Sequence, residues 1–271
     1  GLCRALVREK GGSSMSSITA LGLVLMLLMI AVGGRQGWSA FLSLLLNFGF
    51  LFFAIILIAF HVPPMMVTLM TGVIILAITI FMGEDDLRTT VTAFWASVVV
   101  LLVLVVLIYL VEHWAMAQGF GLEDSDDLEG MSTAIGISYL KVIITTAALS
   151  TLGAIAEAAM AIAAGLTEIL GEHPDLSDNR LMQSGMEIGK QIIGTTLNTL
   201  FFGFFGGLLA LFIWFAGLNY SFGTIVNDKI FVSEIIAVLI SFIAVIVTVP
   251  ASTMIMIWQK HRGIDKDEVV K

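Results

Sequence analysis

One carboxylate stands out among the residues that could do chemistry, because it lies inside an apolar stretch. Residues 153–169 read GAIAEAAMAIAAGLTEI, and nine of these seventeen residues are Ala or Gly. Glu157 lies within this stretch and Glu168 lies near its end. A charged side chain deep in a bilayer costs at least about 2.5 kcal/mol, so it faces protein or water and often has a function. Glu157 is therefore a candidate for proton or ion coupling, with Glu168 about three turns further along the same face.

The composition explains why a bilayer is the relevant solvent. The chain has 271 residues, of which 58% are hydrophobic and 13% are charged, and its mean hydropathy is +1.02. A soluble domain has about 25% charged residues. These values indicate an all-α, polytopic helical membrane protein in contact with lipid. The net charge of −8 gives no basic surface for nucleic acid, and the single cysteine, Cys3, excludes a disulfide framework.

Hydrophobic length predicts about seven transmembrane helices, since about 20 apolar residues cross the hydrocarbon core. The expected spans lie near residues 17–34, 40–60, 65–82, 91–112, 140–165, 191–217 and 231–258. Lys and Arg concentrate in alternate loops and in the tail WQKHRGIDKDEVVK. By the positive-inside rule, this places the C-terminus in the cytoplasm and the N-terminus outside.

The chain divides into one membrane domain and two short ends. Residues 1–14 read GLCRALVREKGGSS and end in a linker-like GGSS before Met15, so they are interpreted as a foreign remnant or a disordered extension. Residues 15–260 form the expected transmembrane domain, and residues 261–271 form the cytoplasmic tail. The acidic segment 121–130 is conceivable as a cation site, but a solvated external loop is favoured because EF-hand spacing is absent.

A row of small residues surrounds Glu157 on one helix face. Small residues at this spacing allow membrane helices to approach closely, so this face is expected to meet another helix. The expected companion is the start of the sixth span, which offers hydroxyl and amide groups followed by glycines. The hydrogen-bonding candidates for Glu157 are Thr195, Thr196 and Asn198. The packing candidates are Gly153, Ala161, Gly165, Gly203, Gly206 and Gly207.

The segment before the sixth span is broadly amphipathic. Apolar residues recur from residue 179 onward, which predicts an in-plane helix on the cytoplasmic side that turns up into the span. Glu187 and Lys190 are three residues apart on it and are expected to form a charged pair. The spans contain no HExxH, CxxC, P-loop or GxSxG pattern, so no catalytic residue, metal site or cofactor is predicted, and an intramembrane hydrolase is disfavoured.

The sequence resembles the YibE/F family of bacterial polytopic membrane proteins over roughly residues 17–260. The resemblance rests on GAIAEAAMAIAAGLTEI, LMQSGMEIGKQIIGTTLNTLFFGFFGG and NFGFLFFAIILIA. Where the family pattern has aspartate, this chain has Glu157, and where it has Gly-Arg, this chain has Gly189 and Lys190. The resemblance implies a bacterial cell membrane protein, a predicted transporter and a related partner chain.

A weaker similarity to the transmembrane core of RND-type permeases implies a proton-coupling carboxylate. Two functions remain open. The first is a secondary transporter or exporter, or a subunit of one, with an unknown small-molecule or ion substrate. The second is a non-transporting subunit that packs against a related partner. Either predicts a homo-oligomer or a hetero-oligomer, and the two differ in whether Glu157 meets a water-accessible cavity.

Overall fold

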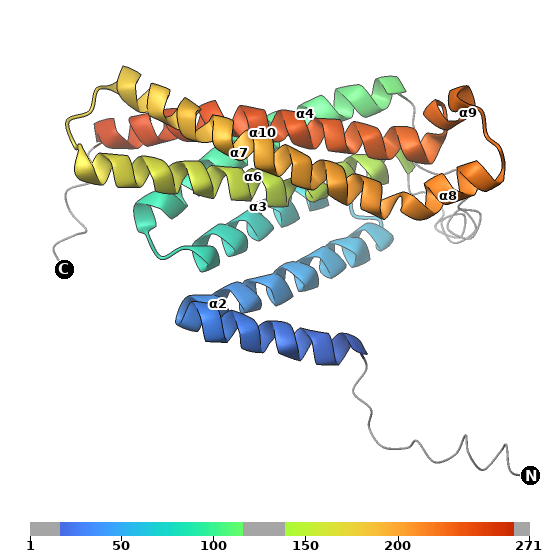
Figure 1. Ribbon diagram of the computed structural model, residues 1–271, viewed down its shortest axis with the longest axis horizontal. Helices are drawn as coiled ribbons and strands as arrows, with labels where there is room; N and C mark the ends of the chain where they lie inside the picture. Colours follow the sequence, from blue (N-terminus) through green and yellow to red (C-terminus); the bar gives the residue numbers. More distant parts are fainter. Residues whose placement is uncertain (1–16, 116–138, 263–271) are drawn as a thin grey trace, which may run out of the picture.

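The computed structural model describes residues 17–115 and 139–262, and every regular element in these ranges is a helix (Figure 1). The predicted all-α polytopic fold is confirmed. The expectations for residues 1–14 and 121–130 and for most of the tail lie outside the described residues. The helices are α2 (Ser17–Ala59), α3 (Pro64–Gly83), α4 (Leu87–Ala115), α6 (Tyr139–Glu172), α7 (Asp178–Gly207), α8 (Leu209–Gly217), α9 (Phe222–Val226) and α10 (Lys229–Arg262).

Helix α6 is the centre of the bundle, and α3, α4, α7 and α10 pack around it. Its sequence allows this because Ala and Gly leave room for four neighbours. Buried hydroxyl pairs also join the helices: Thr145 lies 2.8 Å from Thr68 of α3, and Thr167 lies 3.1 Å from Thr89 of α4. Thr145 lies near the start of α6 and Thr167 near its end, whereas Thr68 and Thr89 both lie near the starts of their helices, so α6 runs parallel to α3 and antiparallel to α4.

Helix α2 contains a sharp reversal at Gly34, whose backbone angles are φ 55° and ψ −125°. Glycine adopts a positive φ readily because it has no Cβ. A Cβ placed on Gly37 would lie 1.9 Å from the carbonyl oxygen of Met29, although residues eight apart in a continuous helix are separated by about 12 Å. The chain therefore folds back on itself here and makes two arms, which Figure 1 shows as a V.

The number of membrane crossings depends on this reversal. Five helices (α2, α3, α4, α6 and α10) are long and apolar enough to span a membrane, and α7 with α8 adds a sixth span if this pair, bent by 48°, is counted as one. The predicted number of seven is reached when the two arms of α2 are counted separately. The alternating directions of these segments in Figure 1 fit that reading.

The segment predicted as an in-plane helix differs in the structure. It forms the first turns of α7, which continues as one helix from Asp178 to Gly207 and packs lengthwise against α10. Cβ atoms on Gly185 and Gly189 would lie 2.2 Å and 2.3 Å from Thr253 and Val249. Close glycine contacts therefore align this segment with α10 and leave no turn between it and the span.

The two ends of the bundle differ in charge. At the end where α10 finishes, here called the Arg262 end, lie the α2 reversal, the α3–α4 turn and the α6–α7 loop (Figure 1). Six of the eight described Lys and Arg residues lie in this half of the bundle: Arg35, Arg88, Arg180, Lys190, Lys260 and Arg262. The opposite end, here called the Lys229 end, carries Lys141 and Lys229.

Exposed tryptophans mark both ends of the bundle. Trp38, Trp95 and Trp258 lie near the Arg262 end, and Trp114 and Trp214 lie near the Lys229 end. Trp95 and Trp114 lie on α4 at a separation of about 28 Å, which matches the hydrocarbon thickness of a bilayer. This pattern is that of the aromatic belts at membrane interfaces.

A row of polar side chains attaches the second arm of α2 to the last turns of α3. Gln36 donates to the carbonyl of Gly83 at 2.8 Å, and Asn47 donates to the hydroxyl of Thr79 at 2.7 Å. Between them, Ser39 and Ser43 donate to two further α3 carbonyls. Because lipid competes with apolar contacts inside a membrane, such hydrogen bonds contribute much of the specificity of helix association.

Candidate functional site

The residues around Glu157 line an open groove of about 390 Å³ between α3 and α6. The α6 wall is mostly small, which explains why a groove exists where two helices would otherwise interdigitate. The α3 wall comes from its last two turns, held in place by the polar row from α2. The lining residues are Thr79, Gly83, Glu84, Gly153, Glu157, Met160, Ala161 and Ala164.

Glu157 is exposed in this groove. Within residues 17–115 and 139–262, no hydrogen bond or ion pair to its carboxylate is seen. It lies level with Thr79, and Met160 contacts the position of a Cβ on Gly83 at 3.8 Å. Because Thr79 is about one turn from the end of α3, Glu157 lies closer to the Arg262 end than its place in the predicted span suggested.

The predicted hydrogen-bonding partners on α7 do not meet Glu157 within one chain. The hydroxyl of Thr195 donates to the carbonyl of Ile192 at 3.0 Å, and the amide of Asn198 donates to the carbonyl of Gly194 at 2.8 Å. Both side chains are exposed on α7. Thr196 is buried, and its hydroxyl has no partner among the described residues. The residues facing α7 from α6 are instead Ala154 and Ala158, which pack with Ile192 and Ile193.

The predicted packing residues fall into two groups. Gly165 lies against α7, because a Cβ on it would be 2.8 Å from the tip of Ile188. Gly153 has open space around it, and Ala161 is exposed in the groove, so their contact with another helix stays a prediction. The same holds for three glycines of α7, which also face open space: Gly203, Gly206 and Gly207.

The remaining charged candidates are peripheral. Glu168 is exposed on α6 beyond the residues that line the groove. Glu187 accepts a hydrogen bond from Gln183 at 3.2 Å, and the described residues show no ion pair between Glu187 and Lys190. The same ranges contain no group of three or more His, Cys, Asp and Glu side chains suited to a metal ion.

Sequence reasoning missed the residues that α3 contributes. Thr79 and Glu84 line the groove opposite Glu157, but they are 78 and 73 positions away in sequence. One carboxylate oxygen of Glu84 accepts from the backbone N–H groups of Asp85 and Asp86. The sequence contains one signal for this wall, because polar residues recur at every third or fourth position in residues 36–47. These are the side chains of α2 that hydrogen-bond to α3.

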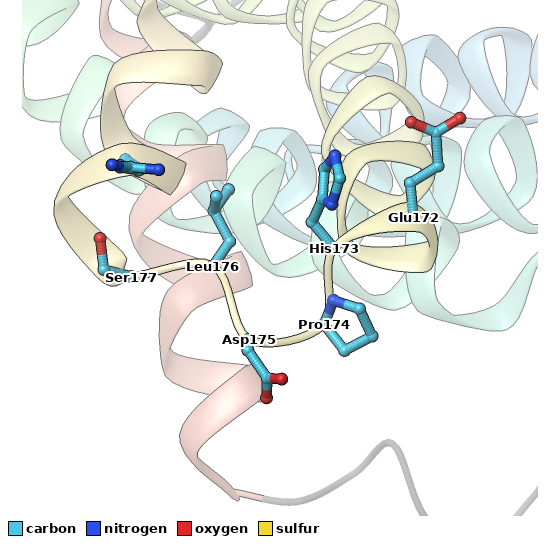
Figure 2. A pocket seen from close by; sticks show the side chains of 7 residues that line it. Glu172, His173, Pro174, Asp175, Leu176 and Ser177 are labelled. Carbon is cyan, nitrogen blue, oxygen red and sulfur yellow. The ribbon is translucent and has the colours of Figure 1, made fainter.

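A larger pocket of about 650 Å³ lies at the α6–α7 loop (Figure 2). Figure 2 shows Pro174 and Asp175 at the apex of this loop. The end of α10 holds the loop, because Lys260 donates to the carbonyl of Leu176 and lies 3.7 Å from Asp178. This pocket is formed only by the last residue of α6, the surface loop and the first turn of α7, whereas the groove at Glu157 lies between two spans and is the better functional candidate. The loop pocket is lined by Glu172, His173, Pro174, Asp175, Leu176, Ser177 and Arg180.

Comparison with known protein families gives a match over nearly the whole membrane domain. No curated protein and no solved structure matches the chain. Residues 21–262 match the family described as YibE/F-like protein. Apart from residues 17–20 at the start of α2, this range contains all the described helices. The chain is therefore a membrane protein that belongs to the YibE/F-like family.

Proposed function

We propose that this protein is a proton- or cation-coupled membrane transporter, or the subunit of one that carries the coupling carboxylate. The observation that carries the proposal is the exposed Glu157 in an open groove between two membrane helices. A carboxylate buried in a dry contact between helices, with no cavity beside it, would instead favour a structural role. An intramembrane carboxylate that reaches a cavity is the arrangement expected of an ion or proton pathway.

The groove has the chemistry for a small cation or a proton. Glu157 supplies a carboxylate, and Thr79 and Glu84 supply oxygen atoms from the opposite wall. Binding at Glu157 becomes transport only if the site is exposed to each side of the membrane in turn. The small α6 wall leaves space for α3 to shift against it, which is the movement such a cycle requires.

Transport can be tested without knowing the substrate by following protons in reconstituted vesicles. Vesicles with an acidic interior and a trapped pH dye would receive NaCl, KCl or MgCl₂ outside. We expect the wild type to dissipate the gradient faster with at least one salt, and Glu157→Gln to behave as protein-free vesicles. Glu172→Gln, at the last residue of the same helix and outside the groove, is the control and should resemble the wild type. Equal rates for the wild type and Glu157→Gln would contradict the coupling role.

The alternative is a non-transporting subunit that binds a related chain. It is favoured by the small residues that face open space on α6 and α7 in the single chain. Under this alternative, Glu157→Gln leaves proton movement unchanged but alters recovery of the assembled complex.

A further inference from the structure

An exposed polar face runs along α6 and α7 at membrane depth. On α6 it consists of Gly153, Glu157, Ala161 and Ala164, and on α7 it consists of Gln191, Gly194, Thr195 and Asn198. We call these eight residues the α6–α7 face. Contact with lipid is unfavourable for such a surface, because carboxylate and amide side chains in membrane spans face protein or water. A Cβ on Gly153 or Gly194 would meet nothing within 4 Å, so the face also permits close approach.

The two rows belong to one continuous surface. Helix α6 uses Ala154, Ala158 and Gly165 against α7, and α7 uses Ile188 and Ile192 against α6. Both helices also pack on α10. At 3.6 residues per turn, the exposed residues of each helix fall on the side away from α10. Figure 1 shows α6 and α7 side by side, with α7 crossing in front of α10.

The depths of the two rows match. Gly165 meets Ile188, and Ala158 packs with Ile192 and Ile193. In this antiparallel register Glu157 lies level with Thr195. The face therefore has an acceptor on α6 and two donor groups on α7 at a similar depth. The amide of Asn198 has a second hydrogen besides the one donated to the carbonyl of Gly194, and the hydroxyl of Thr195 can turn from the carbonyl of Ile192 toward a carboxylate.

We propose that the α6–α7 face is a homodimer interface. Identical chains in one membrane share the same orientation, so a two-fold axis between them runs along the membrane normal and preserves depth. Rotation about this axis brings Glu157 of one copy to the α7 row of the other, where the partner's Thr195 and the partner's Asn198 offer hydrogen bonds. The same contact repeats in reverse, and this hydrogen-bond complementarity is the reason to assign the face to a second copy. The partner copy thereby contributes residues to the Glu157 site.

Cysteine cross-linking in native membranes tests the interface. In a Cys3→Ser background, Ala161→Cys and Gly194→Cys present thiols on the face, and Val103→Cys presents one on the lipid side of α4, where it is 52% exposed. We expect Ala161→Cys paired with Gly194→Cys in one chain to give an oxidised dimer and Val103→Cys to stay monomeric. Absence of the dimer, or an equal amount from Val103→Cys, overturns the proposal.

A second measurement tests the interface without depending on the exact positions of the two thiols. Ala161→Leu and Gly194→Leu add bulk to the face, and native mass spectrometry in mild detergent should show loss of the dimer for both. Val103→Leu should retain it. A wild-type protein that is monomeric, or a dimer that survives both substitutions, overturns the proposal. Neither measurement requires transport, so a result here is independent of the vesicle experiment.

Discussion

The Nε2 atom of His261 lies 2.7 Å from Oδ2 of Asp178 and joins the end of α10 to the first turn of α7. This hydrogen bond holds the pKa of Asp178 below its ordinary value of 3.8, and the charges of His261 and Lys260 act in the same direction. Asp178 lies outside the apolar part of α7, at the base of the α6–α7 loop. The pair is a clamp between two helix ends that are 83 residues apart in sequence.

We expect Asp178→Asn to release this clamp and expose the α6–α7 loop to proteases. A lowered carboxyl pKa contributes stability that is present above about pH 3.8 and is lost as the pH falls through the lowered value. Limited proteolysis near neutral pH should therefore cut Asp178→Asn faster within residues 173–177. Asp175→Asn, in the same loop, is the control, and equal cleavage of the two variants would refute the clamp.

A graded series at three glycines tests the packing around α7. Gly185→Ala and Gly189→Ala should each lower the free energy of unfolding by about 1–3 kcal/mol, because the stiff side chains of Thr253 and Val249 cannot move aside. Gly165→Ala should cost less, since it meets only the tip of Ile188. Thermal unfolding in detergent measures the series.

Gly203→Ala is the control for that series, because a Cβ there meets nothing within 4 Å. It should be neutral or slightly stabilising, as alanine favours helix over glycine by up to about 1 kcal/mol. A loss of stability for Gly203→Ala as large as for Gly189→Ala would mean that the contacts of the added Cβ do not determine the order of the series.

The sequence was sufficient for the fold class and for most spans, since hydrophobic length determines both. It was insufficient for predicting which helices pack together, because hydrophobic periodicity does not identify the helix that packs against a given helix face. The row around Glu157 was expected to meet the sixth span, yet within one chain Ala154 and Ala158 occupy that contact. Gly185 and Gly189 have the small-xxx-small spacing, but they were interpreted as part of an in-plane helix. The two walls of the groove lie more than 70 residues apart, and only the tertiary structure joins them.

Asn47→Leu should loosen the second arm of α2. Its amide bond to Thr79 is one of four side-chain bonds that attach the arm to α3, and a hydrogen bond inside a membrane contributes about 0.6 kcal/mol on average. Hydrogen–deuterium exchange should rise across residues 35–59 and stay unchanged in α4. Leu45→Ala, on the exposed side of the same arm, should leave exchange as in the wild type.

Membrane topology can be checked by thiol labelling in a Cys3→Ser background. The excess of Lys and Arg at the Arg262 end predicts that this end is cytoplasmic. Asp85→Cys should react with an impermeant maleimide only after the cells are permeabilised, and Asn227→Cys should react in intact cells. The reverse pattern would invert the orientation of every span.

The depth of Glu157 determines how the membrane voltage acts on this protein. A charge that crosses the full field gains about 2.3 kcal/mol per 100 mV. From the Arg262 end, Glu157 lies about one turn below the last residue of α3, or about one fifth of a bilayer about 30 Å thick. Under the proposed function, a cation that moves between that side and Glu157 crosses only about one fifth of the field, which corresponds to about 0.5 kcal/mol per 100 mV. Most of the electrical work therefore falls on the step between Glu157 and the Lys229 end, and that step sets the voltage dependence of transport.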